Sequence, residues 1–69
     1  MRVTVRQARE QAGLSQLEVA RAMGVSEPTY RKYERKPELL PLHKSVILAR
    51  VLGVPFMDLQ LSDADETPL

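Results

Sequence analysis

The chain has 69 residues, no cysteine, one histidine and a net charge of +1. This length predicts one small domain with a modest core. The missing cysteines exclude a disulfide scaffold, a thiolate metal site and a cysteine nucleophile, and a lone histidine excludes the common multi-histidine metal sites. A reducing cytoplasm fits this composition better than secretion does. No apolar run approaches the roughly 20 residues of a membrane span.

The charges are unevenly divided along the chain. Residues 60–69 carry three acids and no base, so the first 59 residues hold ten bases against six acids, a net charge of +4. Four of the bases crowd into six residues: Arg31, Lys32, Arg35 and Lys36. Such a cluster fits a polyanionic partner or a solvated helix face, and charge alone leaves both open.

Two short helices are predicted in the N-terminal part. The first runs from about Thr4, a good N-cap residue, to Ala12 and stops at Gly13. Its expected inward residues are Val5, Ala8 and Ala12. Ser15 and Glu18 form a capping box that opens the second helix, which ends at Gly24. Its expected inward residues are Leu17, Ala20 and Met23.

Three further segments follow, and we expect no strands. Ser26 caps a third helix in which Pro28 is tolerated in the first turn and which ends before or near Pro37. Its apolar side carries Tyr30 and Tyr33. A fourth helix is predicted over Leu42–Leu52 and a short fifth turn over Phe56–Leu59. The expected inward residues of the fourth helix are Leu42, Val46, Leu48, Ala49 and Leu52, and Met57 is expected to fill the core.

The segment from Gln16 to Glu34 has the pattern of a helix-turn-helix. Ala20 lies where the two helices would cross, Gly24 suits a turn residue with positive φ, and Val25 would insert between the helices. Any tight helical hairpin needs a small residue and a glycine turn. The pattern alone therefore favours DNA binding without establishing it.

The longer pattern resembles the Cro/cI-type, or XRE, helix-turn-helix family. The matching segments are Gly13-Leu14-Ser15-Gln16-Leu17-Glu18-Val19-Ala20, Met23-Gly24-Val25-Ser26 and Thr29-Tyr30-Arg31-Lys32-Tyr33-Glu34, and they continue through Leu42, Val46, Leu48-Ala49, Leu52-Gly53-Val54 and Leu59. The resemblance covers about residues 4–59. It implies an all-α, lambda-repressor-like bundle of five helices whose third helix enters the DNA major groove, and a transcriptional regulator that binds as a dimer.

The resemblance also implies which residues contact DNA. The expected base contacts are Glu27, Pro28, Arg31 and Lys32, which form one stripe of the third helix. The cations can donate to guanine, whereas the glutamate can accept from cytosine or pair with a neighbouring base such as Arg31. The expected phosphate contacts are Gln16, Thr29, Arg35 and Lys36, although Thr29 could instead be a local cap.

Two structural features carry over from the family. Arg9 and Glu34 match an ion pair that bridges the first and third helices. The family usually has Asn-Gly after the glutamate, where this chain has Arg35-Lys36. Because lysine disfavours the left-handed conformation that glycine would take there, the path of the following loop is open.

Exposed apolar residues on the fourth helix predict a two-fold dimer contact. Ile47 and Val51 lie four residues apart and share one stripe, which Val54 and Pro55 could extend. The alternative is that Ile47 is buried against Phe56.

The sequence thus predicts a helix-turn-helix domain over residues 1–60 and an acidic, disordered tail over residues 61–69. The expected function is sequence-specific regulation of transcription, favouring a homodimeric repressor on a near-palindromic operator. The expected protein is bacterial or phage-encoded and cytoplasmic, and associates with the nucleoid when it is bound to DNA. No cofactor, membrane or catalysis is expected, because no nucleophile has a base beside it. One alternative is an antitoxin or other module that binds a toxin or another protein. A small hydrolase or metal protein is disfavoured by the residue types.

Overall fold

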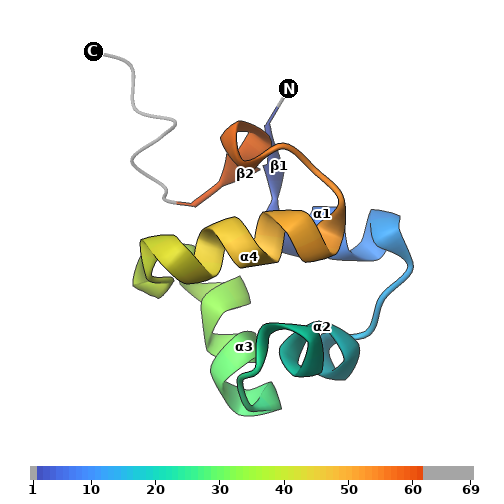
Figure 1. Cartoon of the computed structure of the whole chain (residues 1–69), viewed down its shortest axis with the longest axis vertical. Coiled ribbons are helices and arrows are strands. Elements are labelled where there is room, and N and C mark those ends of the chain that lie inside the picture. The colour runs from blue at the N-terminus through green and yellow to red at the C-terminus, as the bar shows by residue number, and fades with distance from the viewer. Residues whose placement is uncertain (1, 62–69) are drawn as a thin grey trace.

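The computed structural model describes residues 2–61, and the predicted acidic tail from residue 62 onward lies outside them. Within that range the chain folds into four α-helices: α1 (Val5–Ala12), α2 (Gln16–Met23), α3 (Glu27–Arg35) and α4 (Leu42–Leu52) (Figure 1). Two 3-10 turns, Pro37–Leu39 and Phe56–Asp58, precede and follow α4. Two short strands, β1 (Val3–Thr4) and β2 (Leu59–Gln60), complete the fold.

Capping residues set the helix boundaries where the sequence predicts them. At the start of α1, α2 and α3, the N-cap hydroxyl accepts a hydrogen bond from the backbone amide three residues on: Thr4, Ser15 and Ser26. A glycine with φ between 72° and 76° ends α1, α2 and α4: Gly13, Gly24 and Gly53. These short helices depend on such caps because the first four amides and the last four carbonyls of a helix have no hydrogen-bond partner within it.

The end of α3 takes a different route, as the missing glycine requires. Lys36 caps α3 with φ −134° and ψ 76°, outside the left-handed region. Its amide still closes the last turn on the Lys32 carbonyl at 2.8 Å. Pro37 then begins a 3-10 turn that leads the chain towards α4.

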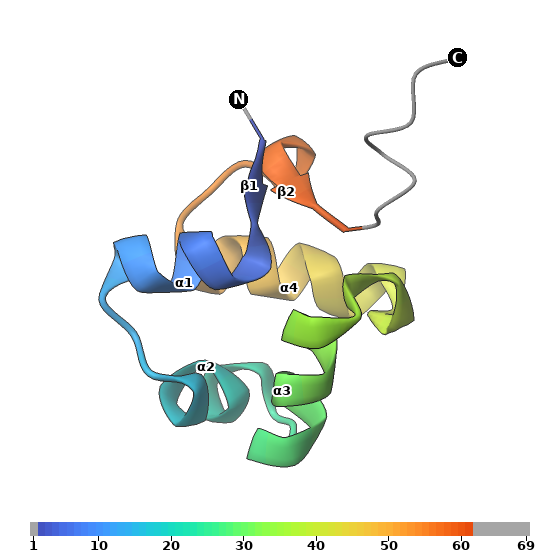
Figure 2. The same cartoon turned by 180° about the vertical axis from the view of Figure 1, so that it is seen from behind.

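The strand pair corrects the prediction of a fold without strands. β1 and β2 are parallel, with Val3 opposite Leu59 and Thr4 opposite Gln60. Figure 2 shows them side by side near the two ends of the described chain. The predicted fifth helix is also corrected, because its segment forms only the 3-10 turn Phe56–Asp58 before Leu59 extends into β2. The all-α class holds in the coarser sense of a mostly helical domain.

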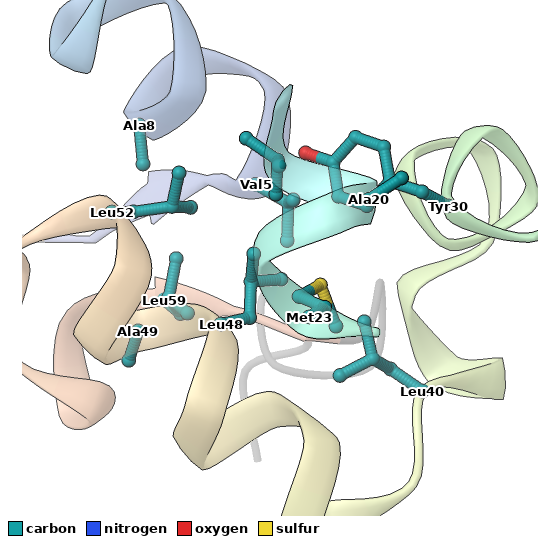
Figure 3. Packing of buried hydrophobic residues seen from close by; sticks show 11 residues of the cluster. Val5, Ala8, Ala20, Met23, Tyr30, Leu40, Leu48, Ala49, Leu52 and Leu59 are labelled. Atoms are coloured by element: carbon teal, nitrogen blue, oxygen red, sulfur yellow. The ribbon is translucent and has the colours of Figure 1, made fainter. Parts of the chain in front are cut away.

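One apolar core joins all four helices and β2 (Figure 3). α2 packs against both α3 and α4, so the helix-turn-helix formed by α2 and α3 is attached to α4 through α2. Tyr30 is fully buried, as expected of a core residue. The buried apolar residues are Val5, Ala8, Val19, Ala20, Met23, Tyr30, Leu40, Leu48, Ala49, Leu52 and Leu59.

Several residues predicted to face inward are exposed instead: Ala12, Leu17, Leu42, Val46 and Met57. In α4 the prediction missed the orientation because a polar residue occupies the buried face. Ser45 is completely buried, and its hydroxyl donates to the Leu42 carbonyl at 2.6 Å. Because that bond satisfies the hydroxyl within the helix, serine can occupy a core position. The helix is therefore oriented with Ser45 inward and with Leu42 and Val46 towards solvent.

Candidate nucleic-acid interface

The outer side of α3 presents the four residues expected to contact bases. Pro28, Arg31 and Lys32 are exposed, and Glu27 is half-buried. Tyr30 points into the core from the same helix, which fixes this stripe towards solvent. The Arg31 guanidinium donates to the Glu27 carboxylate at 2.9 Å, so the acid is paired within the stripe.

Thr29 takes part in the cap of α3. Its amide donates to the Ser26 hydroxyl oxygen at 3.3 Å, and that hydroxyl donates to Thr29 Oγ1 at 2.8 Å. This geometry matches the local-cap alternative for Thr29, while its predicted phosphate contact stays a prediction.

Basic residues gather at the C-terminal end of α3. Arg35 and Lys36 are exposed there, and together with Lys32 and Leu39 they line a hollow of about 450 Å³. Three bases of the sequence cluster therefore lie together around one hollow, and grouped positive charge of this kind attracts polyanions.

A polar network ties α3 to the two preceding helices. Arg9 forms an ion pair with Glu34 through its Nε, and its Nη1 donates to the Leu14 carbonyl at 2.9 Å. Gln16 Nε2 donates to Glu34 Oε1 at 3.1 Å. The side chains of Arg9 and Glu34 are only 14% and 6% exposed. Glu34 thus joins α1, through Arg9, and α2, through Gln16, to the helix that carries the predicted base contacts.

The network holds Glu34 ionised although it is buried. Burial acts to raise the pKa of Glu34, but interactions with Arg9, Tyr30 and Gln16 together outweigh it and leave the pKa below its ordinary 4.5. The hydrogen bond to Glu34 raises the pKa of Arg9. An ionised carboxylate with these donors is the arrangement that stabilises a buried acid.

Tyr30 lies against this network with its hydroxyl buried. The hydroxyl makes no hydrogen bond of good geometry within the described residues, although it is close enough to Glu34 for the two to interact electrostatically. Burial is the largest cause that raises the pKa of Tyr30, and the close approach of its hydroxyl to the Glu34 carboxylate raises it further. The phenol therefore stays neutral, and Tyr30 acts as a core residue and not as a base-stacking one.

A cavity of about 500 Å³ opens where α1, α2 and α3 meet. Its lining residues are Arg6, Arg9, Gln16, Arg31, Glu34 and Arg35. Sequence reasoning missed Arg6 as a site residue. Its spacing from Arg9 was an available signal, because residues three apart lie on the same face of a helix.

The residues predicted for the dimer contact are unequally exposed. Ile47 is 39% exposed, so it is not buried as the alternative required, and Pro55 is also exposed. Val51 and Val54 are half-buried and pack against the core. The predicted stripe is thus narrower than the sequence indicated.

Two other kinds of site were searched for over residues 2–61. Those residues contain no group of three or more histidine, aspartate or glutamate side chains placed to hold a metal ion. None of the helices in this range has the length and apolar character needed to cross a membrane.

Comparison with known proteins identifies the family. The family model for helix-turn-helix domains, HTH_3, matches residues 5–59. Searches of curated proteins and of solved structures each returned no match. The matched range begins with α1, ends at the first residue of β2 and contains the α2–turn–α3 unit, and the family is one of DNA-binding regulators and not of enzymes. The chain therefore belongs to the Cro/cI-type, or XRE, helix-turn-helix family.

Proposed function

We propose that this protein represses transcription by occupying a near-palindromic operator as a homodimer, in the cytoplasm of a bacterium or a phage-infected cell. The observation that carries the proposal is the outer stripe of α3. Its two cations, Arg31 and Lys32, face solvent while Tyr30 anchors the helix in the core. A helix held in this way can enter the major groove with its side chains directed at base edges.

Within this proposal, the residues divide into two kinds of contact. Glu27, Pro28, Arg31 and Lys32 read bases. Gln16, Thr29, Arg35 and Lys36 contact phosphates. Phosphate contacts orient the protein and supply affinity for any sequence, whereas base contacts supply selectivity.

This division is tested by two variants on an operator obtained by selecting bound duplexes from a random pool. Arg31→Ala should weaken operator binding by about 1–3 kcal/mol and relax the preference at one base pair. Lys36→Ala should weaken binding to all duplexes alike and reduce the slope of log affinity against log salt by about one unit.

The matched control is Arg50→Ala, which removes an exposed arginine from α4. It should leave both selectivity and salt slope unchanged. If Arg31→Ala kept the affinity and selectivity of the unmodified protein, α3 would not be the helix that reads the operator.

An antitoxin is the second candidate, and one observation favours it. Leu39, Leu42 and Val46 are 49%, 71% and 40% exposed, an amount of apolar surface that a partner protein could cover. Coexpression with the neighbouring genes followed by purification separates the candidates. A stoichiometric second protein whose toxicity this chain suppresses would support the antitoxin, and a chain that purifies alone would support the simple repressor.

A further inference from the structure

The cavity between α1, α2 and α3 contains an exposed arginine, Arg6, that no predicted DNA contact uses. Of its four arginines, Arg9 is neutralised by Glu34. Arg6 and Arg31 each pair with a glutamate four residues away on their own helix, at 3.3 and 2.9 Å. Both of these arginines are solvent-exposed, and ion pairs at the surface contribute little to stability. Arg35 is exposed at the same opening.

We propose that this cavity binds one backbone phosphate of duplex DNA and that Arg6 of α1 supplies a direct contact to it. The inference rests on the proposed DNA-binding function and adds α1 to a surface otherwise built from α2 and α3. The Arg6 side chain is 70% exposed, so it can leave Glu10 and turn towards a ligand without disturbing the core. Its planar guanidinium presents paired donors that match phosphate oxygens.

The carboxylate in the cavity wall does not oppose an anion there. Glu34 Oε2 accepts from Arg9, which neutralises the charge, and Glu34 Oε1 accepts from Gln16, so both oxygens are hydrogen-bonded. Gln16 is also the first residue of α2, and the cavity therefore adjoins the positive end of that helix. The remaining cations give the cavity a net positive field.

The test measures binding of a mixed-sequence duplex of about two helical turns by fluorescence anisotropy over a range of salt concentrations. Arg6→Gln removes one cation and should lower the slope of log affinity against log salt by about 0.9. If the two lines meet at 1 M salt, that slope difference corresponds to an affinity about eightfold weaker at 0.1 M.

Glu10→Gln is the matched control because it breaks the same ion pair and leaves Arg6 in place. It should bind the duplex at least as tightly as the unmodified protein does. Its slope of log affinity against log salt should not be lower than that of the unmodified protein. Circular dichroism should show all variants folded, since both side chains lie on the surface of α1. A slope for Arg6→Gln equal to that of the unmodified protein overturns the contact.

The experiments distinguish a wrong assignment of the Arg6 contact from an absence of DNA binding altogether. If Lys36→Ala lowers the slope while Arg6→Gln does not, the protein binds DNA but Arg6 does not contact its backbone. If the unmodified protein binds no duplex, both proposals fail.

Competition with inorganic phosphate tests whether the cavity binds a phosphate of the DNA backbone or free phosphate. At equal ionic strength, phosphate should compete with the duplex better than chloride does, and Arg6→Gln should abolish the difference. If phosphate shifts the NMR signals of Arg6 while Arg6→Gln leaves duplex binding unchanged, the cavity binds free phosphate and the DNA contact is refuted.

Discussion

Glu34 connects α3 to both of the preceding helices. Its carboxylate is 6% exposed and receives donors from Arg9 on α1 and Gln16 on α2. A buried carboxylate with one partner would be costly, but two donors and an oppositely charged neighbour compensate for the lost hydration. The three helices therefore meet at one side chain, directly behind the surface proposed to contact DNA.

Removing Glu34 should cost far more than removing an exposed acid. Glu34→Ala leaves Arg9 buried without its counterion, and we expect the free energy of unfolding to fall by about 3–5 kcal/mol. Glu10→Ala, which breaks the exposed Arg6 pair, should cost less than about 1 kcal/mol. Urea denaturation of both variants and a double-mutant cycle between Arg9 and Glu34 measure this. A coupling energy near zero would show that the bridge contributes nothing.

Acid should destabilise the protein through the same carboxylate. Because the pKa of Glu34 is below its ordinary 4.5, the unfolded chain takes up this proton before the folded one does. The stabilisation is therefore complete above about pH 4.5 and is lost as the pH falls through the folded-state pKa. Thermal melts at descending pH should show a smaller acid-induced fall in Tm for Glu34→Gln than for the unmodified protein. Equal falls would mean that Glu34 is not the linked group.

At the scale of elements, the turn between α2 and α3 is set by one backbone conformation. Gly24 has φ 76°, and its amide closes the last turn of α2 on the Ala20 and Arg21 carbonyls. Val25 then packs half-buried against the core, which fixes where α3 begins. A Cβ added at Gly24 would meet no atom within 4 Å, so only backbone strain opposes a side chain there.

Two substitutions at Gly24 separate the free-energy cost of its backbone conformation from the cost of a steric clash. Gly24→Ala should lower the free energy of unfolding by about 1–2 kcal/mol, the cost of the left-handed conformation for a residue with a Cβ. Gly24→Asn should cost less, because asparagine tolerates that conformation better. Chemical denaturation gives both values. A larger loss for asparagine than for alanine would point to a steric clash and refute the argument.

At the scale of the whole molecule, the spacing of two α3 helices would decide operator recognition. A dimer on successive major grooves needs them about 34 Å apart. We propose that the contact is built on Ile47, which is 39% exposed, and Pro55, with Val51 and Val54 contributing their exposed edges. Such a contact is self-complementary and gains from binding a palindromic site.

Ile47→Lys should give a folded monomer that binds a half-site but loses most of its affinity for the full operator. The introduced charge would face its own copy across the two-fold axis and oppose association. Sedimentation and circular dichroism report the two properties separately. A variant that remains dimeric rules out this surface, and one that unfolds places Ile47 in the core.

Local signals in the sequence determined most of the helices. The hydroxyls of Thr4, Ser15 and Ser26 and the glycines 13, 24 and 53 mark boundaries that the structure confirms. These signals work because a cap satisfies neighbouring backbone groups and needs no distant partner. The same locality explains why the helix-turn-helix pattern, and through it the family, could be recognised before the fold was known.

Only the tertiary structure decided which faces are buried and which distant residues meet. Ser45 takes a core position because a bond within its own helix satisfies it, and this turns Leu42 and Val46 outward. β1 and β2 are two residues each, too short to leave a periodic pattern, and form because the two ends of the domain lie together. Arg6 joins a basic cavity through the packing of three helices. Each outcome depends on contacts between segments far apart in the chain, which no local pattern encodes.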